Sequence, residues 1–249
     1  VSLCIGVLIS IFSLAKLMVY VMNWYPVQTW AFFFGLIIAS SAYMIYDIKG
    51  WKVNDVLFFA AGIVLGVVIC TLSPTTTPDS LWFIFLCGAI AVCTMILPGI
   101  SGSFILVILG KYDFIMQSIN QMNIPVLLVF GLGCIIGILG FSKFLHWLLK
   151  RFERPTMLVL VGFVLGALVK VWPWNDMHAV AEGQCLRSGM APDAASTAAD
   201  LIMSSGNPMK VLDLQIPGAI IWAIAGLALV AVLEYLSSLH KLKEEAKTE

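Results

Sequence analysis

The sequence predicts an all-α polytopic membrane protein with a re-entrant helical hairpin, and three observations lead to this fold class. Of the 249 residues, 61% are hydrophobic and 11% are charged, and the mean hydropathy is +1.00. Soluble domains carry about 25% charged residues. The apolar residues gather in runs of the length that a helix needs to cross a bilayer, about 20 residues. One apolar region, 81–110, is interrupted at its centre by proline, glycine and serine.

Polar and turn-forming segments between the apolar runs delimit the predicted spans. These spans are 1–22, 29–46, 56–72, 124–149, 157–172 and 216–236. The segment 111–123 is predicted to be a polar connector, and the long polar segment 175–215 is predicted to hold a short helix near 194–203. Because Val1 already lies in an apolar run without a basic leader, we expect the natural start to lie upstream.

The stretch 95–112, which reads MILPGISGSFILVILGKY, is the part of the apolar sequence least compatible with a regular helix. Pro98 lacks a backbone donor, and Gly99 and Gly102 are flexible residues that often adopt positive φ. The apolar flanks on either side are each too short for a full crossing. The chain is therefore predicted to enter the membrane, break at 98–103 and turn back. The alternative is an ordinary crossing helix with a proline kink.

Lysine and arginine in short loops predict the orientation of the spans. The 150–154 turn and the tail, 240–249, each carry three such residues and are expected on the cytoplasmic side. The polar segment 175–215 then lies outside. A re-entrant hairpin at 81–110 also places the loop 47–55, with its two lysines, inside, whereas a fully crossing helix would place that loop outside.

A weak internal repeat appears when the chain is shifted by 127 residues. The shift aligns Gly6 with Gly133, Ile9 with Ile136, Ile11 with Ile138, Lys16 with Lys143, Thr29 with Thr156, and Gly35 with Gly162. In the predicted topology the two copies run in opposite directions, which is the inverted-repeat architecture of many transporters.

The repeat gives the predicted domain organisation, a single transmembrane domain over 1–249. Its parts are 1–80, the remainder of a first repeat whose N-terminal portion is missing; 81–172, the second repeat with the hairpin; 173–215, an extracytoplasmic loop; and 216–249, the last span and cytoplasmic tail.

The composition also excludes several classes of function. A net charge of zero provides no basic surface for nucleic acid. Five of the six cysteines lie in apolar runs, where cysteine behaves as a small hydrophobic residue, so no disulfide is expected. No cluster of residues has the spacing of metal ligands, and neither a metal nor a cofactor is predicted.

The broken stretch is the candidate binding site, because half-helix N-termini present free N–H groups and a positive dipole end to anions. The N–H groups after Pro98 and the hydroxyls of Ser101 and Ser103 could cradle the oxygens of a phosphate. The alternative for both hydroxyls is hydrogen bonding back to a helix carbonyl. Lys16 and Lys143 lie within spans and could supply positive charge, or they could extend to the membrane interface.

Three further cations on the cytoplasmic side have two interpretations each. His146 follows Lys143 at i+3 and either extends its face or has a structural role. Arg151 and Arg154 either meet anionic lipid head groups or anchor the predicted cytoplasmic turn.

The runs LPGISGSF at 97–104 and LGKY at 109–112 resemble the bacterial polyprenyl-phosphate transporters, a membrane family formerly of unknown function. The resemblance implies a flippase that returns undecaprenyl phosphate, or a related lipid, across the bacterial cytoplasmic (inner) membrane for carrier-lipid recycling in cell-envelope synthesis. It implies no enzymatic step, and the candidate coupling ion is a proton or sodium. Together with the helix break and the two lysines inside spans, the resemblance makes the following residues the candidate substrate-binding set: Pro98, Gly99, Ser101, Gly102, Ser103, Lys16 and Lys143. Family members usually carry a second Pro-Gly-Val-Ser-Gly-Gly-type motif near the N-terminus, which this sequence lacks, as a truncated start would explain.

Two other functions remain open from the sequence. Membrane lipid-pyrophosphate phosphatases also use re-entrant hairpins, with a Pro-Gly-x-Ser-Arg-Ser motif, but Gly102 stands here where that arginine would be. A phosphatase needs a group that stabilises the charge of phosphoryl transfer, and the broken stretch offers neither arginine nor a metal site. A small-anion transporter or channel would also suit half-helix termini, but would not explain any lipid specificity.

Overall fold

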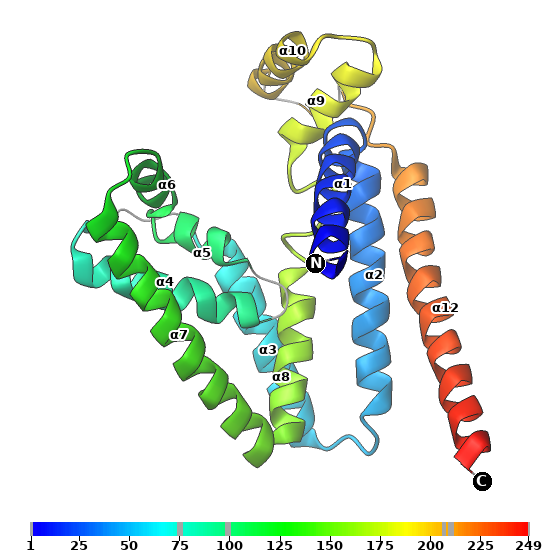
Figure 1. Ribbon diagram of the computed structural model, residues 1–249. Coiled ribbons are helices and arrows are strands. Elements are labelled where there is room, and N and C mark those ends of the chain that lie inside the picture. Colours follow the sequence, from blue (N-terminus) through cyan, green and yellow to red (C-terminus); the bar gives the residue numbers. More distant parts are fainter. Residues whose placement is uncertain (1, 74–76, 98–100, 206–207, 209–211, 249) are drawn as a thin grey trace. The chain divides into compact units, whose positions relative to one another are not determined.

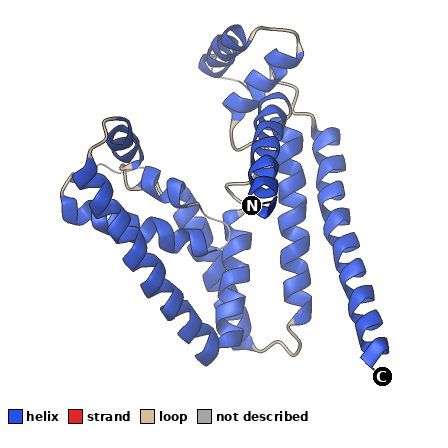
Figure 2. Cartoon of the chain, in the orientation of Figure 1, coloured by secondary structure: helices blue, strands red, loops and turns tan. Residues whose placement is uncertain are grey.

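The computed structural model describes residues 2–73, 77–97, 101–205, 208 and 212–248 (Figure 1). Every regular element in these residues is a helix (Figure 2). Among the described residues, four helices are long and apolar enough to cross a membrane, over Pro26–Tyr46, Val53–Thr71, Ile124–Arg151 and Ile216–Ser238. The predicted class, an all-α polytopic membrane protein, is confirmed.

The helices follow most of the apolar runs within about five residues, but the last helix continues beyond the predicted span end at 236, through the charged tail, to Thr248. They are α1 (Ser2–Trp24), α2 (Pro26–Asp47), α3 (Val53–Thr71), α4 (Leu81–Ile96), α5 (Gly102–Ile108), α6 (Tyr112–Asn120), α7 (Ile124–Arg151), α8 (Glu153–Ala167), α9 (Met177–Arg187), α10 (Pro192–Ser204) and α12 (Ile216–Thr248). The helix predicted near 194–203 is α10. Two helices are additional: α6 lies in the predicted connector, and α9 precedes α10.

The chain divides into two compact units. One unit comprises residues 1–42 and 170–249, and the other comprises residues 43–169. The second unit combines α3 with the hairpin, α7 and α8. The organisation into two repeats stays a prediction.

In the unit 43–169, α3 and α8 lie side by side (Figure 1). They pack against each other through glycines on both helices. A Cβ on Gly62 would lie 2.3 Å from the Val159 carbonyl oxygen, and one on Gly162 would lie 2.3 Å from the Phe59 carbonyl oxygen. Gly66 and Gly166 make the same kind of contact one turn further along. The contacts advance together along both helices, so α3 and α8 run parallel. Small residues of this kind allow membrane helices to pack backbone against backbone.

The helices α4 and α7 are paired in the same way. A Cβ on Gly133 would lie 2.1 Å from the Phe85 carbonyl oxygen, and one on Gly137 would lie 2.6 Å from Ala89 Cα. These contacts also advance together, so α4 runs parallel to α7. At the start of both helices, Ile84 and Val126 share one buried cluster.

We expect Gly133→Ala to destabilise the α4–α7 pair, because its methyl group would meet backbone rather than a movable side chain. Overpacking of this kind costs about 1–3 kcal/mol. Gly131 lies on the same helix, and nothing lies within 4 Å of a Cβ placed on it, so Gly131→Ala should be neutral or stabilise the helix by up to about 1 kcal/mol. Thermal unfolding of the purified variants measures the difference, and equal transitions would contradict the packing described here.

In the unit formed by 1–42 and 170–249, α2 runs parallel to α12, because Ala219 shares a buried cluster with Val27 and Ala31, and the contact of Gly35 with Ala223 follows one turn further along both helices. A Cβ on Gly35 would lie 2.1 Å from the Ala223 carbonyl oxygen, and one on Gly226 would lie 2.3 Å from the Phe32 carbonyl oxygen. The short helices α9 and α10 pack on each other through a small core that includes Ala181 and Ala199, both fully buried.

The end of α9 contacts the turn between α1 and α2. Arg187 donates a hydrogen bond from Nη1 to the Trp24 carbonyl oxygen, and its guanidinium lies 5.6 Å from the centroid of the Tyr25 ring. The polar segment 175–215 therefore contains an ordered helical pair in contact with a helix turn, which the sequence predicted only in part.

Candidate functional site

The helices α4 and α5 form an antiparallel hairpin. A Cβ on Gly102 would lie 2.6 Å from the Ala91 carbonyl oxygen, Leu106 shares a buried cluster with Cys87 and Ala91, and Leu109 packs on the same cluster. The contacts move backward along α4 as they move forward along α5, so α5 returns beside α4. After α5 the chain bends by 109° into α6. The hairpin predicted over 81–110 is therefore present.

A buried lysine joins the two ends of this hairpin. Lys111 Nζ donates hydrogen bonds to Asp79 Oδ1 at 2.5 Å and to the Thr77 carbonyl oxygen at 2.6 Å. Thr77 Oγ1 in turn donates to the Leu109 carbonyl oxygen at 2.6 Å. The lysine is only 2% exposed. We call these three contacts the hairpin latch.

Two further features support the geometry of the latch. The Lys111 ammonium lies 5.9 Å and 5.7 Å from the ring centroids of Phe83 and Phe114, a distance at which aromatic faces attract cations. Gly110 has φ +63°, so the turn that brings Lys111 back toward Asp79 suits glycine. The LGKY run at 109–112 does not by itself predict this role for Lys111, because its partner Asp79 lies 32 residues away in the sequence.

The tip of the hairpin lies level with the middle of α7. Cys93 Sγ is 3.6 Å from the Gly137 carbonyl oxygen, and α4 ends three residues later at Ile96. The helix α7 continues to Arg151, and its 28 residues span about 42 Å. The hairpin thus accompanies α7 for about half of its length and then turns back.

Ser101 and Ser103 lie at this tip with exposed side chains. Ser101 is the N-cap of α5, and its Oγ accepts a hydrogen bond from the Phe104 N–H at 3.2 Å. The two serine Oγ atoms are 3.1 Å apart, a hydrogen-bond distance. Among the described residues, the two hydroxyls therefore contact the Phe104 N–H and each other. The alternative predicted from the sequence was a hydrogen bond to a helix carbonyl.

Gly102 is required at the tip for a different reason from the one expected. Among the described residues, positive φ at glycine occurs at Gly50, Gly110 and Gly189, so the left-handed conformation considered for Gly102 is wrong. Gly102 is instead the first residue of α5, buried against α4, where a Cβ would overlap the Ala91 carbonyl. The other two motif residues, Pro98 and Gly99, lie outside the described residues.

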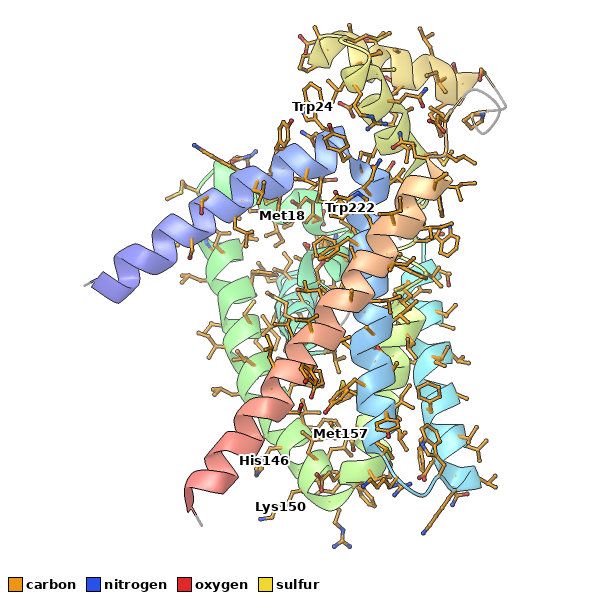
Figure 3. All side chains as sticks on the ribbon, turned by 90° about the vertical axis from the view of Figure 1, so that its right-hand side faces the viewer. Met18, Trp24, His146, Lys150, Met157 and Trp222 are labelled. Carbon is orange, nitrogen blue, oxygen red and sulfur yellow. The ribbon has the colours of Figure 1, made fainter. Side chains whose placement is uncertain are left out.

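The two candidate lysines have exposed side chains. Lys16 lies on α1 in one unit and Lys143 on α7 in the other. On α7, Lys143, His146 and Lys150 follow one another at i, i+3 and i+7, which places them on one face of the helix. Figure 3 shows His146 and Lys150 at the C-terminal end of α7. The substrate-binding role of Lys16 and Lys143 stays a prediction.

Arg154 is held by an acidic partner near the α7–α8 turn. Its Nη2 and Nε lie 2.7 Å and 3.1 Å from Asp55 Oδ2, and Nη2 also donates to the Gly50 carbonyl oxygen at 2.6 Å. Asp55 is 5% exposed and accepts a further bond from the Lys52 N–H. The contacts place the 47–55 loop beside the 150–154 turn, in agreement with the charge-based prediction that both lie on one side of the membrane.

These features define a multi-pass membrane protein organised around a hairpin of discontinuous helices. Residues 1–186 match the family described as VCA0040-like, undecaprenyl phosphate translocase-like. The chain belongs to this family, and the resemblance seen in the sequence is confirmed.

Two relatives give the same assignment. The chain is 40% identical over 171 residues to a polyprenyl-phosphate transporter of Vibrio cholerae serotype O1, a match that covers 69% of this chain and 56% of the relative. It is 31% identical over 192 residues to a polyprenyl-phosphate transporter of Staphylococcus aureus, covering 70% of this chain and 68% of the relative. The chain thus spans just over half the length of the first relative. No solved structure matches the chain.

Proposed function

We propose that this chain is part of a flippase that moves undecaprenyl phosphate, or a related polyprenyl phosphate, across the bacterial cytoplasmic membrane and so recycles the carrier lipid of cell-envelope synthesis. The observation that carries the proposal is the hairpin tip. Its two exposed serine hydroxyls lie level with the middle of a helix long enough to cross the membrane. The names of both relatives support the same substrate.

The proposal requires that the hairpin be re-entrant. Both of its ends lie at the end of the unit where α7 begins, since Ile84 clusters with Val126 and the latch joins 77–79 to 109–111. When α7 crosses the membrane, the hairpin enters from the side of Ile124 and reaches about half way. Non-helical backbone at that depth is tolerated only inside protein or beside a water-filled cavity, which is where transporters bind their substrates.

Re-entrance is tested by labelling introduced cysteines. Ser80→Cys and Gln121→Cys lie at exposed positions on either side of the hairpin, and Glu153→Cys lies at an exposed position at the other end of α7. In a background without reactive cysteines, a membrane-impermeant maleimide should label 80 and 121 from the outer side and 153 only after permeabilisation. Labelling of 80 and 121 from opposite sides would contradict the hairpin.

At the tip, the phosphate would accept hydrogen bonds from the Ser101 and Ser103 hydroxyls. A hydrogen bond to a charged group contributes about 1.5–3 kcal/mol, so we expect Ser101→Ala to weaken binding of lipid phosphate by about ten-fold or more. Ser238, whose hydroxyl donates to the Tyr235 carbonyl on α12, gives the matched control, and Ser238→Ala should bind like the parent.

A second variant separates phosphate binding from helix capping. Ser101→Asp keeps an acceptor for the Phe104 N–H, so the cap is retained, but it places a negative charge beside the phosphate. It should bind lipid phosphate less tightly than Ser101→Ala does. Its thermal unfolding temperature should be at least as high as that of Ser101→Ala. If Ser101→Asp bound lipid phosphate as the parent does, the site would lie elsewhere.

An inverted repeat would supply the two alternating conformations of such a transporter. Two described segments 127 residues apart support it. A helix break occurs at Tyr25 and at Phe152, and the hydroxyls of Thr29 and Thr156 donate to the carbonyl oxygens of those same residues, at 2.8 Å and 2.6 Å. Gly35 and Gly162, also aligned by the shift, both contact the backbone of a parallel helix.

The deciding experiment is a flipping assay with the full-length protein in liposomes. We expect polyprenyl phosphate to move between leaflets chemically unchanged. Imposed proton and sodium gradients, applied one at a time, should identify the coupling ion by their effect on the rate. Release of inorganic phosphate from a lipid pyrophosphate would instead favour the phosphatase, and absence of both activities would contradict the proposal.

A further inference from the structure

The unit 43–169 contains a cavity of about 490 Å³ beyond the tip of the hairpin. Its walls come from the second half of α7, the first half of α8, Phe58 of α3, and Leu97 at the end of α4. The cavity lies within the usual size range of ligand pockets, about 300–1,000 Å³.

The short hairpin explains why this space exists. The first half of α7 is covered by α4 as far as Gly137. Beyond that point α4 ends, while α7 continues for 14 further residues to the turn at Phe152. Phe141, Leu145 and Leu148, which lie on one face of this uncovered half, therefore line the cavity together with residues of α8.

The described lining residues offer no free polar group to a ligand. Among them Thr156 is the one with a hydroxyl, and that hydroxyl already donates to the Phe152 carbonyl oxygen at 2.6 Å. The remaining lining residues carry aliphatic and aromatic side chains or proline. A small anion or a lipid head group would find no partner here, whereas a flexible hydrocarbon chain would.

Both ends of the cavity adjoin features that attract an anion. Leu97 is the last described residue before the motif whose serines would bind the phosphate, and it also packs beside Phe104 of α5 on one buried cluster. At the far end, Phe152 and Pro155 belong to the turn that carries the exposed cations Lys150 and Arg151. The cavity thus runs between the hairpin tip and a basic turn.

We propose that this cavity holds the isoprenoid chain of the lipid phosphate, with the first isoprene units beside Leu97 and the following units along Leu145 toward the Phe152 turn. The assignment rests on the proposed function, because it requires the phosphate to bind at Ser101 and Ser103. The cavity provides what the serines cannot, which is a preference for a long, methyl-branched chain over other phosphate-bearing lipids.

Chain length gives the test, since a short chain would end before it reaches Leu145. Leu145→Trp fills the cavity, and Leu139→Trp, on the opposite exposed face of α7, is the matched control. Lipid tails already lie in hydrocarbon, so the cavity stabilises a bound chain through van der Waals packing and not through transfer from water. We expect Leu145→Trp to weaken binding of undecaprenyl phosphate by about ten-fold. Binding of geranyl phosphate should stay within about two-fold of the parent value, and Leu139→Trp should change neither.

The outcomes separate the cavity from the site at the tip. If Leu145→Trp leaves binding of undecaprenyl phosphate unchanged, or weakens the binding of both lipids equally, the cavity does not hold the isoprenoid chain. A parent protein that binds geranyl and undecaprenyl phosphate with equal affinity overturns the cavity proposal and leaves the proposed function intact. A parent that binds neither overturns the proposed function as well.

Photolabelling of the unaltered protein provides a second measurement that does not depend on a variant's folding. An undecaprenyl phosphate analogue with a diazirine on its chain should label the peptide 141–148, and an excess of phosphatidylglycerol should not remove the label. Loss of the label to phosphatidylglycerol would show that ordinary membrane lipid fills the cavity, and labelling confined to other segments would also overturn the proposal.

Discussion

Gly102→Val is expected to weaken binding of lipid phosphate at least ten-fold and to separate α5 from α4. A Cβ at this position would lie 2.6 Å from the Ala91 carbonyl oxygen, and an α-helical backbone cannot yield as a flexible side chain can. The first turn of α5 would have to move away, and Ser101 and Ser103 would move with it. Overpacking costs about 1–3 kcal/mol, and a displaced phosphate site would lose at least ten-fold in affinity, or about 1.4 kcal/mol.

The control for this variant is Gly140→Val, because nothing lies within 4 Å of a Cβ at Gly140. Lipid-phosphate binding by each purified variant gives the primary measurement, and thermal unfolding shows whether the rest of the chain stays folded. If Gly102→Val bound lipid phosphate like the parent, the tip of the hairpin would be scaffold rather than site.

Lys111→Met is expected to open the base of the hairpin while leaving the residues of the tip unchanged. The substitution removes hydrogen bonds to Asp79 and to the Thr77 carbonyl but keeps an unbranched apolar chain among Phe83 and Phe114. Asp79 has a side chain that is 65% exposed, so water can solvate it afterwards. We therefore expect the free energy of unfolding to fall by about 2 kcal/mol, near the lower end of the range for hydrogen bonds to charged groups.

The measurements are thermal unfolding and the rate of proteolysis within 72–112, together with flipping by the full-length protein. Lys150→Met removes an exposed cation from the basic turn and should leave the thermal unfolding temperature and the proteolysis rate unchanged. Asp79→Asn keeps an acceptor for the lysine and should have an intermediate effect. An unchanged proteolysis rate in Lys111→Met would mean that the latch does not hold the hairpin closed.

The sequence predicted those parts of the fold that depend on local pattern. Long apolar runs between polar turns located the spans, and the Pro-Gly-Ile-Ser-Gly-Ser interruption predicted the hairpin, because no regular helix accommodates it. The helix α9 was missed, since its composition is weakly apolar and its order comes from small residues packed against α10. Helix propensity alone carries little weight when tertiary packing decides.

The sequence likewise predicted only those parts of the candidate site that depend on local pattern. The serines were predicted because hydroxyls at a helix break have a clear chemical use. The latch, the Asp55–Arg154 pair and the apolar cavity were not predicted, because each joins residues far apart in the sequence. The prediction of positive φ at Gly102 was wrong. Close approach of two helices and positive φ both require glycine, and the sequence alone does not distinguish the two causes.

The pairing of α2 with α12 has a consequence for how the protein is made. The glycines that join these helices, Gly35 and Gly226, lie on either side of the whole of the other compact unit in the sequence, and α12 follows all the other helices of this chain during synthesis. During synthesis, α2 must therefore wait in the membrane with its Gly35 face uncovered while residues 43–169 assemble first. A chain whose synthesis stops before Ile216 would lack α12 and leave that face exposed to insertion chaperones and membrane proteases.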